Sequence, residues 1–111
     1  MLTERERRFM RLQDIGCICC AKEGYPDVPV DVHHLVDKGY REHSGGDTAT
    51  LPLCPWHHRG VPPSGFSIDT ALSYAGPSLA LHKKRFIRRY GTERELLAEV
   101  DRRIEELERA A

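Results

Sequence analysis

Two short segments, each with a pair of metal-binding side chains, constrain this chain more than any other feature. Cys17 and Cys20 are separated by two residues in GCICC, and Cys54 and His57 repeat that spacing in LPLCPWHHRG (residues 51–60). Zinc takes four soft or borderline ligands in a tetrahedron, and two such turns supply all four. The spacing therefore predicts a Cys₃His zinc site.

Cys19 lies inside the first pair. We expect its side chain to point away from the other ligands, as a packed thiol. The competing interpretation is that these cysteines are small buried side chains without metal. A zinc ion would favour folding of a small chain, because its binding free energy becomes folding free energy.

The chain is expected to form a single domain over residues 1–111, with one modest core. Its 40% hydrophobic and 31% charged residues are typical of globular proteins. No apolar run reaches the roughly 20 residues of a membrane helix, and the charged start MLTERERRFMRL does not resemble a signal peptide. We therefore expect a cytoplasmic protein without membrane contact, in which cysteines serve metal binding or catalysis.

The formal net charge is zero, which argues against DNA binding by bulk positive charge. The segment HKKRFIRRY (82–90) nevertheless carries five basic residues and no acid. Basic side chains in this part of the chain either contact phosphates or form solvated helix faces. The candidates are Arg59, Lys83, Lys84, Arg85, Arg88 and Arg89.

Capping residues and hydrophobic periodicity predict helices near both ends of the chain. Thr3 followed by Glu6 is a capping-box pattern at the start of a helix over 3–14. The same pattern begins at Thr92, ahead of an amphipathic helix over 93–109. Leucines on two faces of this last helix either pack on the chain's own core or form a homodimer seam, so we expect a monomer or a homodimer.

Short strands and turns are expected between these helices. β-branched residues predict a strand in VDVHHLV (30–36), and TLPLC (50–54) is a second candidate. A helical turn over 69–74 follows. A further helix is expected to include Leu79, Leu81, Phe86 and Tyr90 and to end at Gly91.

Three histidines are left outside the zinc site. They are the pair His33 and His34, and His58, which follows the second of the two ligand turns; these turns, Cys17–Cys20 and Cys54–His57, are called the first and second knuckle below. Adjacent residues of a strand point to opposite faces, so His33 and His34 do not both bind one ion from an ideal strand. One can bind metal while the other activates water or contacts substrate, and His58 can serve a second metal. The alternative is that all three are surface histidines or are hydrogen-bonded in the core.

The order of these motifs resembles the HNH endonucleases, with their ββα-metal hairpin. The strings VHHL, LPLCPWHHRG, GPSLA and F..RYGTE.ELL are similar to the phage-encoded branch related to the Ref recombination-enhancement nuclease, over about residues 9–97. The resemblance implies an α+β fold with a small zinc-containing HNH-like core, flanked by one N-terminal and two C-terminal helices. It also implies metal-dependent DNA cleavage in a bacterial host cell, in cooperation with a RecA-type recombinase filament.

The resemblance implies a role for each of these histidines. His34 corresponds to the general base that deprotonates water, and His33 to a metal ligand that is Asp in most relatives. His58 corresponds to the metal-binding histidine after the second knuckle. The catalytic cation would be Mg²⁺, Mn²⁺ or Zn²⁺, and a histidine at position 33 favours ions such as Zn²⁺, Mn²⁺ and Co²⁺ over Mg²⁺.

The chain also departs from the family pattern. The asparagine usually found before the second knuckle is absent, and Asp47 and several threonines occupy that segment. His43, in the preceding loop, would orient substrate or bind metal in its place. The sequence leaves the third ligand of the catalytic metal undecided. His82 is one candidate, and its other interpretation is a residue at the edge of a basic helix that faces phosphates.

Other functions remain in competition. A non-catalytic zinc module that binds DNA or protein would explain the missing asparagine. A redox function for CICC lacks the βαβ context of thioredoxin-like proteins. Trp56, between two knuckle ligands, either stacks on a base or covers the zinc turn against the core.

Overall fold

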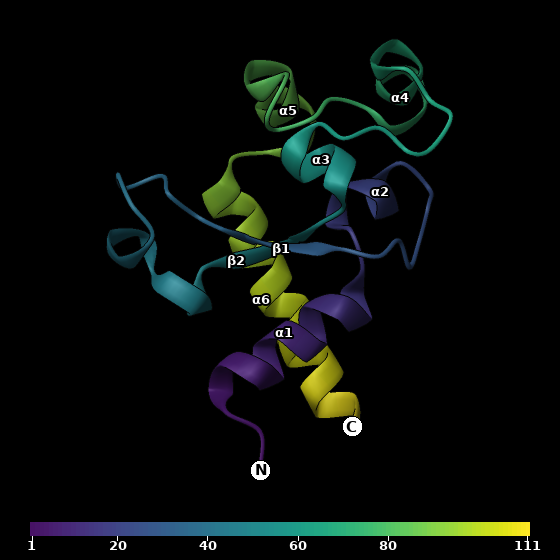
Figure 1. The fold of residues 1–111 in the computed structure, drawn as a ribbon. Coiled ribbons are helices and arrows are strands. Elements are labelled where there is room, and N and C mark those ends of the chain that lie inside the picture. The colour runs from purple at the N-terminus through teal and green to yellow at the C-terminus, as the bar shows by residue number, and fades with distance from the viewer.

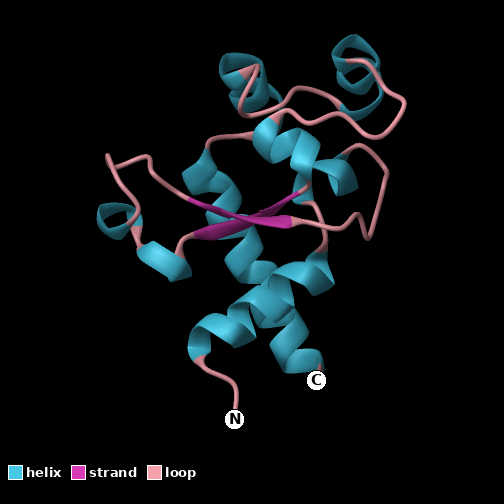
Figure 2. Ribbon diagram, in the orientation of Figure 1, coloured by secondary structure: helices cyan, strands magenta, loops and turns pink.

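A β-hairpin followed directly by a short helix lies at the centre of the fold (Figures 1 and 2). The computed structural model describes residues 1–111, and its element order confirms the α+β class. The helices and strands are α1 (Glu4–Ile15), α2 (Ile18–Lys22), β1 (Asp31–His34), η1 (Glu42–Ser44), η2 (Gly46–Thr48), β2 (Thr50–Leu53), α3 (Pro55–Arg59), α4 (Ile68–Ala75), α5 (Lys83–Tyr90) and α6 (Glu93–Ala110), where η marks 3₁₀ turns.

The two strands pair antiparallel, with Asp31 opposite Leu53 and His34 opposite Thr50. All of β2 is buried, whereas β1 is half-buried along its length. Because side chains alternate along a strand, Asp31 and His33 share one face of β1, and His34 lies on the other. The hairpin therefore directs neighbouring histidines to two sides.

The helices α1 and α6 begin at the capping boxes predicted from the sequence, at Thr3 and Thr92. Helix α6 runs past the hairpin and packs against α1 below it, where both chain termini lie (Figure 1). Arg8 of α1 joins the layers: it donates hydrogen bonds to the Thr50 carbonyl at 2.8 Å and to the Asp101 carboxylate at 2.9 Å. These contacts fix the hairpin on the helix pair.

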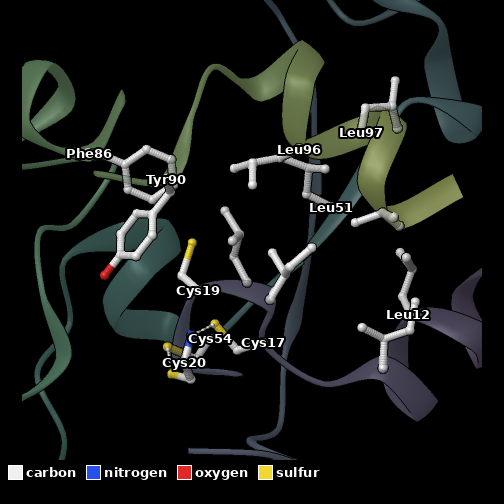
Figure 3. Packing of buried hydrophobic residues seen from close by; sticks show 14 of the residues in the cluster. Leu12, Cys17, Cys19, Cys20, Leu51, Cys54, Phe86, Tyr90, Leu96 and Leu97 are labelled. Atoms are coloured by element: carbon white, nitrogen blue, oxygen red, sulfur yellow. Dashed lines mark hydrogen bonds between the residues drawn. The ribbon is translucent and has the colours of Figure 1, made fainter. Parts of the chain in front are cut away.

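One hydrophobic core extends from α1 through β2 to α6 and α5 (Figure 3). Leu12 and Leu51 are fully buried in it. The paired leucines Leu96 and Leu97, which suggested a dimer seam, are both buried in this same core. They pack on their own chain, and a homodimer through α6 stays a prediction. No helix is long and apolar enough to cross a membrane.

Helix α5 starts at Lys83, so the prediction that Leu79 and Leu81 belong to it is wrong. The Leu79 amide donates to the carbonyl of His57 in α3, at 2.9 Å, and residues 79–81 form a turn ahead of the helix. His82, the residue before α5, has the non-helical angles φ −136° and ψ 51°. The break in helical geometry at His82 thus sets the start of this helix.

Candidate metal centre and active site

The two knuckles form short helical turns that local hydrogen bonds hold in shape. Cys17 is the N-cap of α2, and its sulfur accepts the Cys20 amide at 3.4 Å. Cys54 is the N-cap of α3, and its sulfur accepts the His57 amide at 3.5 Å. The two-residue spacing therefore places both ligands of each knuckle at the start of one helical turn.

The four ligand atoms converge in the buried interior. His57 Nδ1 lies 3.4 Å from the sulfurs of Cys17 and Cys20 and 3.3 Å from that of Cys54. The sulfurs of Cys20 and Cys54 are 3.6 Å apart, and all four atoms lie within 4.8 Å of one another. Zinc bonds of about 2.0 Å to nitrogen and 2.3 Å to sulfur give tetrahedral edges of roughly 3.5–3.8 Å. The cluster could therefore hold a structural zinc ion, as the spacing predicts.

The pKa shifts of the cluster residues follow from the same close approach of their side chains. Hydrogen bonds from Cys17 and Cys20 hold the pKa of the Cys54 thiol far below its usual range. Burial opposes the charged form of His57, but hydrogen bonds with Cys17 and Cys54 raise the pKa of its imidazole to about 10. A divalent cation would displace these protons on binding.

A second layer of polar groups orients His57. Its Nε2 donates to the Ala75 carbonyl at 2.7 Å, which leaves Nδ1 to face the three sulfurs. Tyr90 donates to the Glu23 carboxylate at 2.7 Å, and Arg89 binds the same carboxylate through two nitrogens. The ring of Tyr90 packs edge-on against the imidazole, with centroids 5.5 Å apart, so His57 is also held from this side.

Cys19 is fully buried, yet its sulfur points away from the three labelled cysteines of the cluster, toward the side of Tyr90 (Figure 3). Burial raises the pKa of its thiol. It is a packed thiol outside the ligand set, as expected. Trp56 is also buried, with its indole N–H donating to the Gly76 carbonyl at 2.9 Å, so it covers the zinc turn against the core.

A second constellation lies where β1 meets α3 and the start of α6. The rings of His33 and His58 are in edge contact, with centroids 4.9 Å apart. His33 Nε2 is hydrogen-bonded to the Glu93 carboxylate. His58 Nδ1 donates to Asp31 at 3.2 Å, and Arg59 donates to the same oxygen at 2.8 Å.

Burial and hydrogen bonds shift the pKa values of two groups in this constellation. Burial, together with nearby His33, lowers the pKa of His58 despite the hydrogen bond to Asp31. Burial also opposes the charged form of Asp31, but hydrogen bonds from Arg59 and His58 outweigh it and lower the pKa of that carboxyl. His58 is therefore neutral and Asp31 ionised near pH 7.

His34 lies apart from this constellation, on the opposite face of β1. Its Nε2 is 2.8 Å from Oδ1 of Asp47, and its ring makes an edge contact with Phe9, with centroids 6.2 Å apart. Arg5 binds the other oxygen of Asp47 at 3.3 Å. Asp47, in the segment that lacks the asparagine, thus orients the predicted general base.

The other predicted site residues lie elsewhere. His43 is exposed, and its Nε2 is 3.1 Å from the Tyr40 hydroxyl. His82 Nδ1 accepts the Ser78 amide at 3.2 Å, with its ring near Trp56. Neither histidine forms a hydrogen bond or a ring contact with His33 or His58.

Most of the predicted phosphate-binding side chains are exposed on α5. Arg59 is paired with Asp31 and Arg89 with Glu23, whereas the other four of the five residues named from α5 form no ion pair. Two of them, together with Arg89, line a surface cavity of about 380 Å³ between α4 and α5. The four are Lys83, Lys84, Arg85 and Arg88.

Sequence reasoning missed two residues of the constellation, Asp31 and Glu93. Asp31 had a detectable signal, because it lies two positions before His33 and so shares its face of the strand. Glu93 had none, since it is 60 positions away and looks like an ordinary first-turn acid of a helix.

The fold and site together define a domain with a buried Cys₃His cluster that could hold zinc, in which a β-hairpin and a helix carry a separate group of histidines. The sequence model of the family described as "Recombination enhancement, RecA-dependent nuclease" matches residues 2–105. The chain belongs to this family, which supports a nuclease role. Neither the curated proteins nor the solved structures gave a significant match.

Proposed function

We propose that this protein is a metal-dependent DNA endonuclease of the HNH type, acting in recombination together with a RecA-type filament. The observation that carries the proposal is the division of labour between adjacent histidines of α3. His57 belongs to the closed cysteine cluster. His58 contacts the ring of His33 and is hydrogen-bonded to the partly exposed carboxylate of Asp31. A nuclease family and this arrangement on a ββα hairpin support the same chemistry.

His33 and His58 would hold the catalytic cation. When bound, that ion would neutralise charge on the phosphate and stabilise the leaving oxygen. The residues fit it, because the Asp31 carboxylate can only accept and so holds the Nδ1 proton of His58, which leaves Nε2 as the ligand atom.

His34 would act as the general base from the last position of β1, with the phosphate lying across the end of the strand so that it reaches both His34 and the ion held by His33 and His58. Because the Asp47 carboxylate can only accept, His34 Nε2 carries the proton and Nδ1 has the free lone pair. That nitrogen would take a proton from the attacking water. Asp47 would hold the imidazole in this tautomer and stabilise the imidazolium that results.

DNA contact would come from the unpaired basic residues of α5. A formal net charge of zero gives the chain little long-range attraction to DNA. Delivery by a recombinase filament, as the family description suggests, would supply that targeting.

The competing function is a zinc module that binds DNA or protein without cleaving. Only one group of three or more metal-binding side chains converges fully, and it is the cysteine cluster. This module would hold one zinc ion and no exchangeable second ion.

The experiment is plasmid nicking by the zinc-loaded protein in Mn²⁺, with and without a RecA–DNA filament. We expect cleavage by the unaltered chain and a loss of about 10²–10⁴-fold in His34→Ala. Zinc content and thermal unfolding should be unchanged in that variant. Undiminished cleavage by His34→Ala would remove it as the base, and absence of any cleavage by the unaltered chain would favour the binding module.

A further inference from the structure

Glu93 occupies an unusual place for an acid in the first turn of a helix. Its side chain is only 12% exposed, as is that of its partner His33. The two residues come from α6 and β1, and they meet beside the ring of His58.

Helix capping does not explain this placement. The capping box of α6 is completed by Glu95, which bonds the Thr92 amide at 2.9 Å. The neighbouring Arg94 is directed to Asp37. His33 is the hydrogen-bonding partner of Glu93, so the carboxylate is held by the histidine site and not by the helix end.

We propose that Glu93 is the third protein ligand of the catalytic divalent cation, together with His33 and His58. This inference rests on the nuclease function proposed above and concerns the same site. His33 already directs Nε2 at a Glu93 oxygen, so two ligand atoms face one another. An ion between them would replace the shared proton and separate the two atoms to about 3 Å, given bonds near 2.0–2.2 Å. Rotation of the Glu93 side chain can supply that movement.

The Glu93 carboxylate would also supply an oxygen ligand at a site where the family's asparagine is missing. Two imidazoles alone favour softer ions, whereas a carboxylate oxygen suits Mg²⁺ and Mn²⁺. Two histidines and one carboxylate leave coordination positions open for a phosphate oxygen and water. Asp31 lies outside this set and fixes the ring of His58 through Nδ1.

The test is Mn²⁺ binding to the zinc-loaded protein, followed by the electron paramagnetic resonance signal of free Mn²⁺. Glu93→Gln keeps the size of the side chain and removes its charge. We expect it to raise the Kd for Mn²⁺ at least about tenfold, as His33→Ala and His58→Ala should. Glu106→Gln, an exposed acid of the same helix without an ion pair, is the control and should bind as the unaltered chain does.

Circular dichroism and zinc content would verify that each variant is folded. Unchanged Mn²⁺ affinity in Glu93→Gln, with loss in His33→Ala and His58→Ala, would overturn the role of Glu93 and leave the nuclease proposal intact. Unchanged affinity in all three variants, or no Mn²⁺ binding by the unaltered chain, would overturn both.

Discussion

The cysteine cluster and the histidine constellation share helix α3 but differ in how their polar atoms are satisfied. His57 is fully buried, with one ring nitrogen facing three sulfurs and the other donating to a main-chain carbonyl. The His58 side chain is 24% exposed and has a carboxylate as its partner. Structural zinc sites are closed by protein ligands, whereas catalytic sites keep an open position. The comparison teaches that adjacent residues of one helix can face a closed, buried cluster on one side and a partly exposed polar group on the other.

The largest expected effect comes from breaking the closed site. Cys54→Ser removes a ligand, and structural zinc binding is worth about 10–16 kcal/mol in small zinc peptides, comparable to the whole stability of a domain. We expect this variant to lose zinc and to unfold, as measured by metal analysis and circular dichroism.

Cys19→Ala is the matched control for that experiment, since Cys19 is equally buried but lies outside the cluster. We expect it to keep its zinc and to lose only about 1–2 kcal/mol of unfolding free energy. A folded Cys54→Ser protein would mean that the zinc cluster does not hold the domain together.

A smaller effect is expected at the open site. Asp31→Ala removes the carboxylate that orients His58, and such outer partners are typically worth about 10–100-fold in metal affinity or activity. Cleavage in Mn²⁺ should fall by that factor while the structural zinc is retained. Asp37→Ala, whose carboxylate pairs with Arg94, should cleave normally. Loss of zinc from Asp31→Ala would show that the two regions are not independent.

The smallest effect concerns the groups behind the zinc cluster. Hydrogen bonds from Arg89 and Tyr90 lower the pKa of Glu23, so its contribution to stability is present above the unfolded-state pKa and is lost as the pH falls. Glu23→Gln should therefore be less stable by about 1 kcal/mol at pH 7, and the difference should shrink below about pH 4. Thermal unfolding of both proteins across this range measures it, and a constant difference would contradict the assignment.

Features encoded locally were predictable from the sequence. Capping boxes placed the starts of α1 and α6 to within a residue, because capping involves residues three positions apart. The zinc ligands were predictable for the same reason, since each knuckle is one turn whose cysteine accepts the amide three residues later.

Features that depend on contacts between distant segments could not be predicted from the sequence. Leu79 lies in a turn that is joined to α3 by the bond from its amide to the His57 carbonyl, and α5 begins only after the non-helical His82. Glu93 meets His33 only through the placement of α6 beside the hairpin, and no local pattern distinguishes it from Glu95. The division of the histidines between two faces of β1 was expected, but their carboxylate partners required the fold.

The most direct test of this account is the zinc bound per chain in His57→Ala and His58→Ala after dialysis, measured beside their cleavage of plasmid DNA. We predict that His58→Ala keeps its zinc ion and its fold but no longer cleaves, whereas His57→Ala loses the zinc and unfolds. Loss of zinc from His58→Ala, or full cleavage by either variant, would contradict the separation of structure from catalysis between these adjacent histidines.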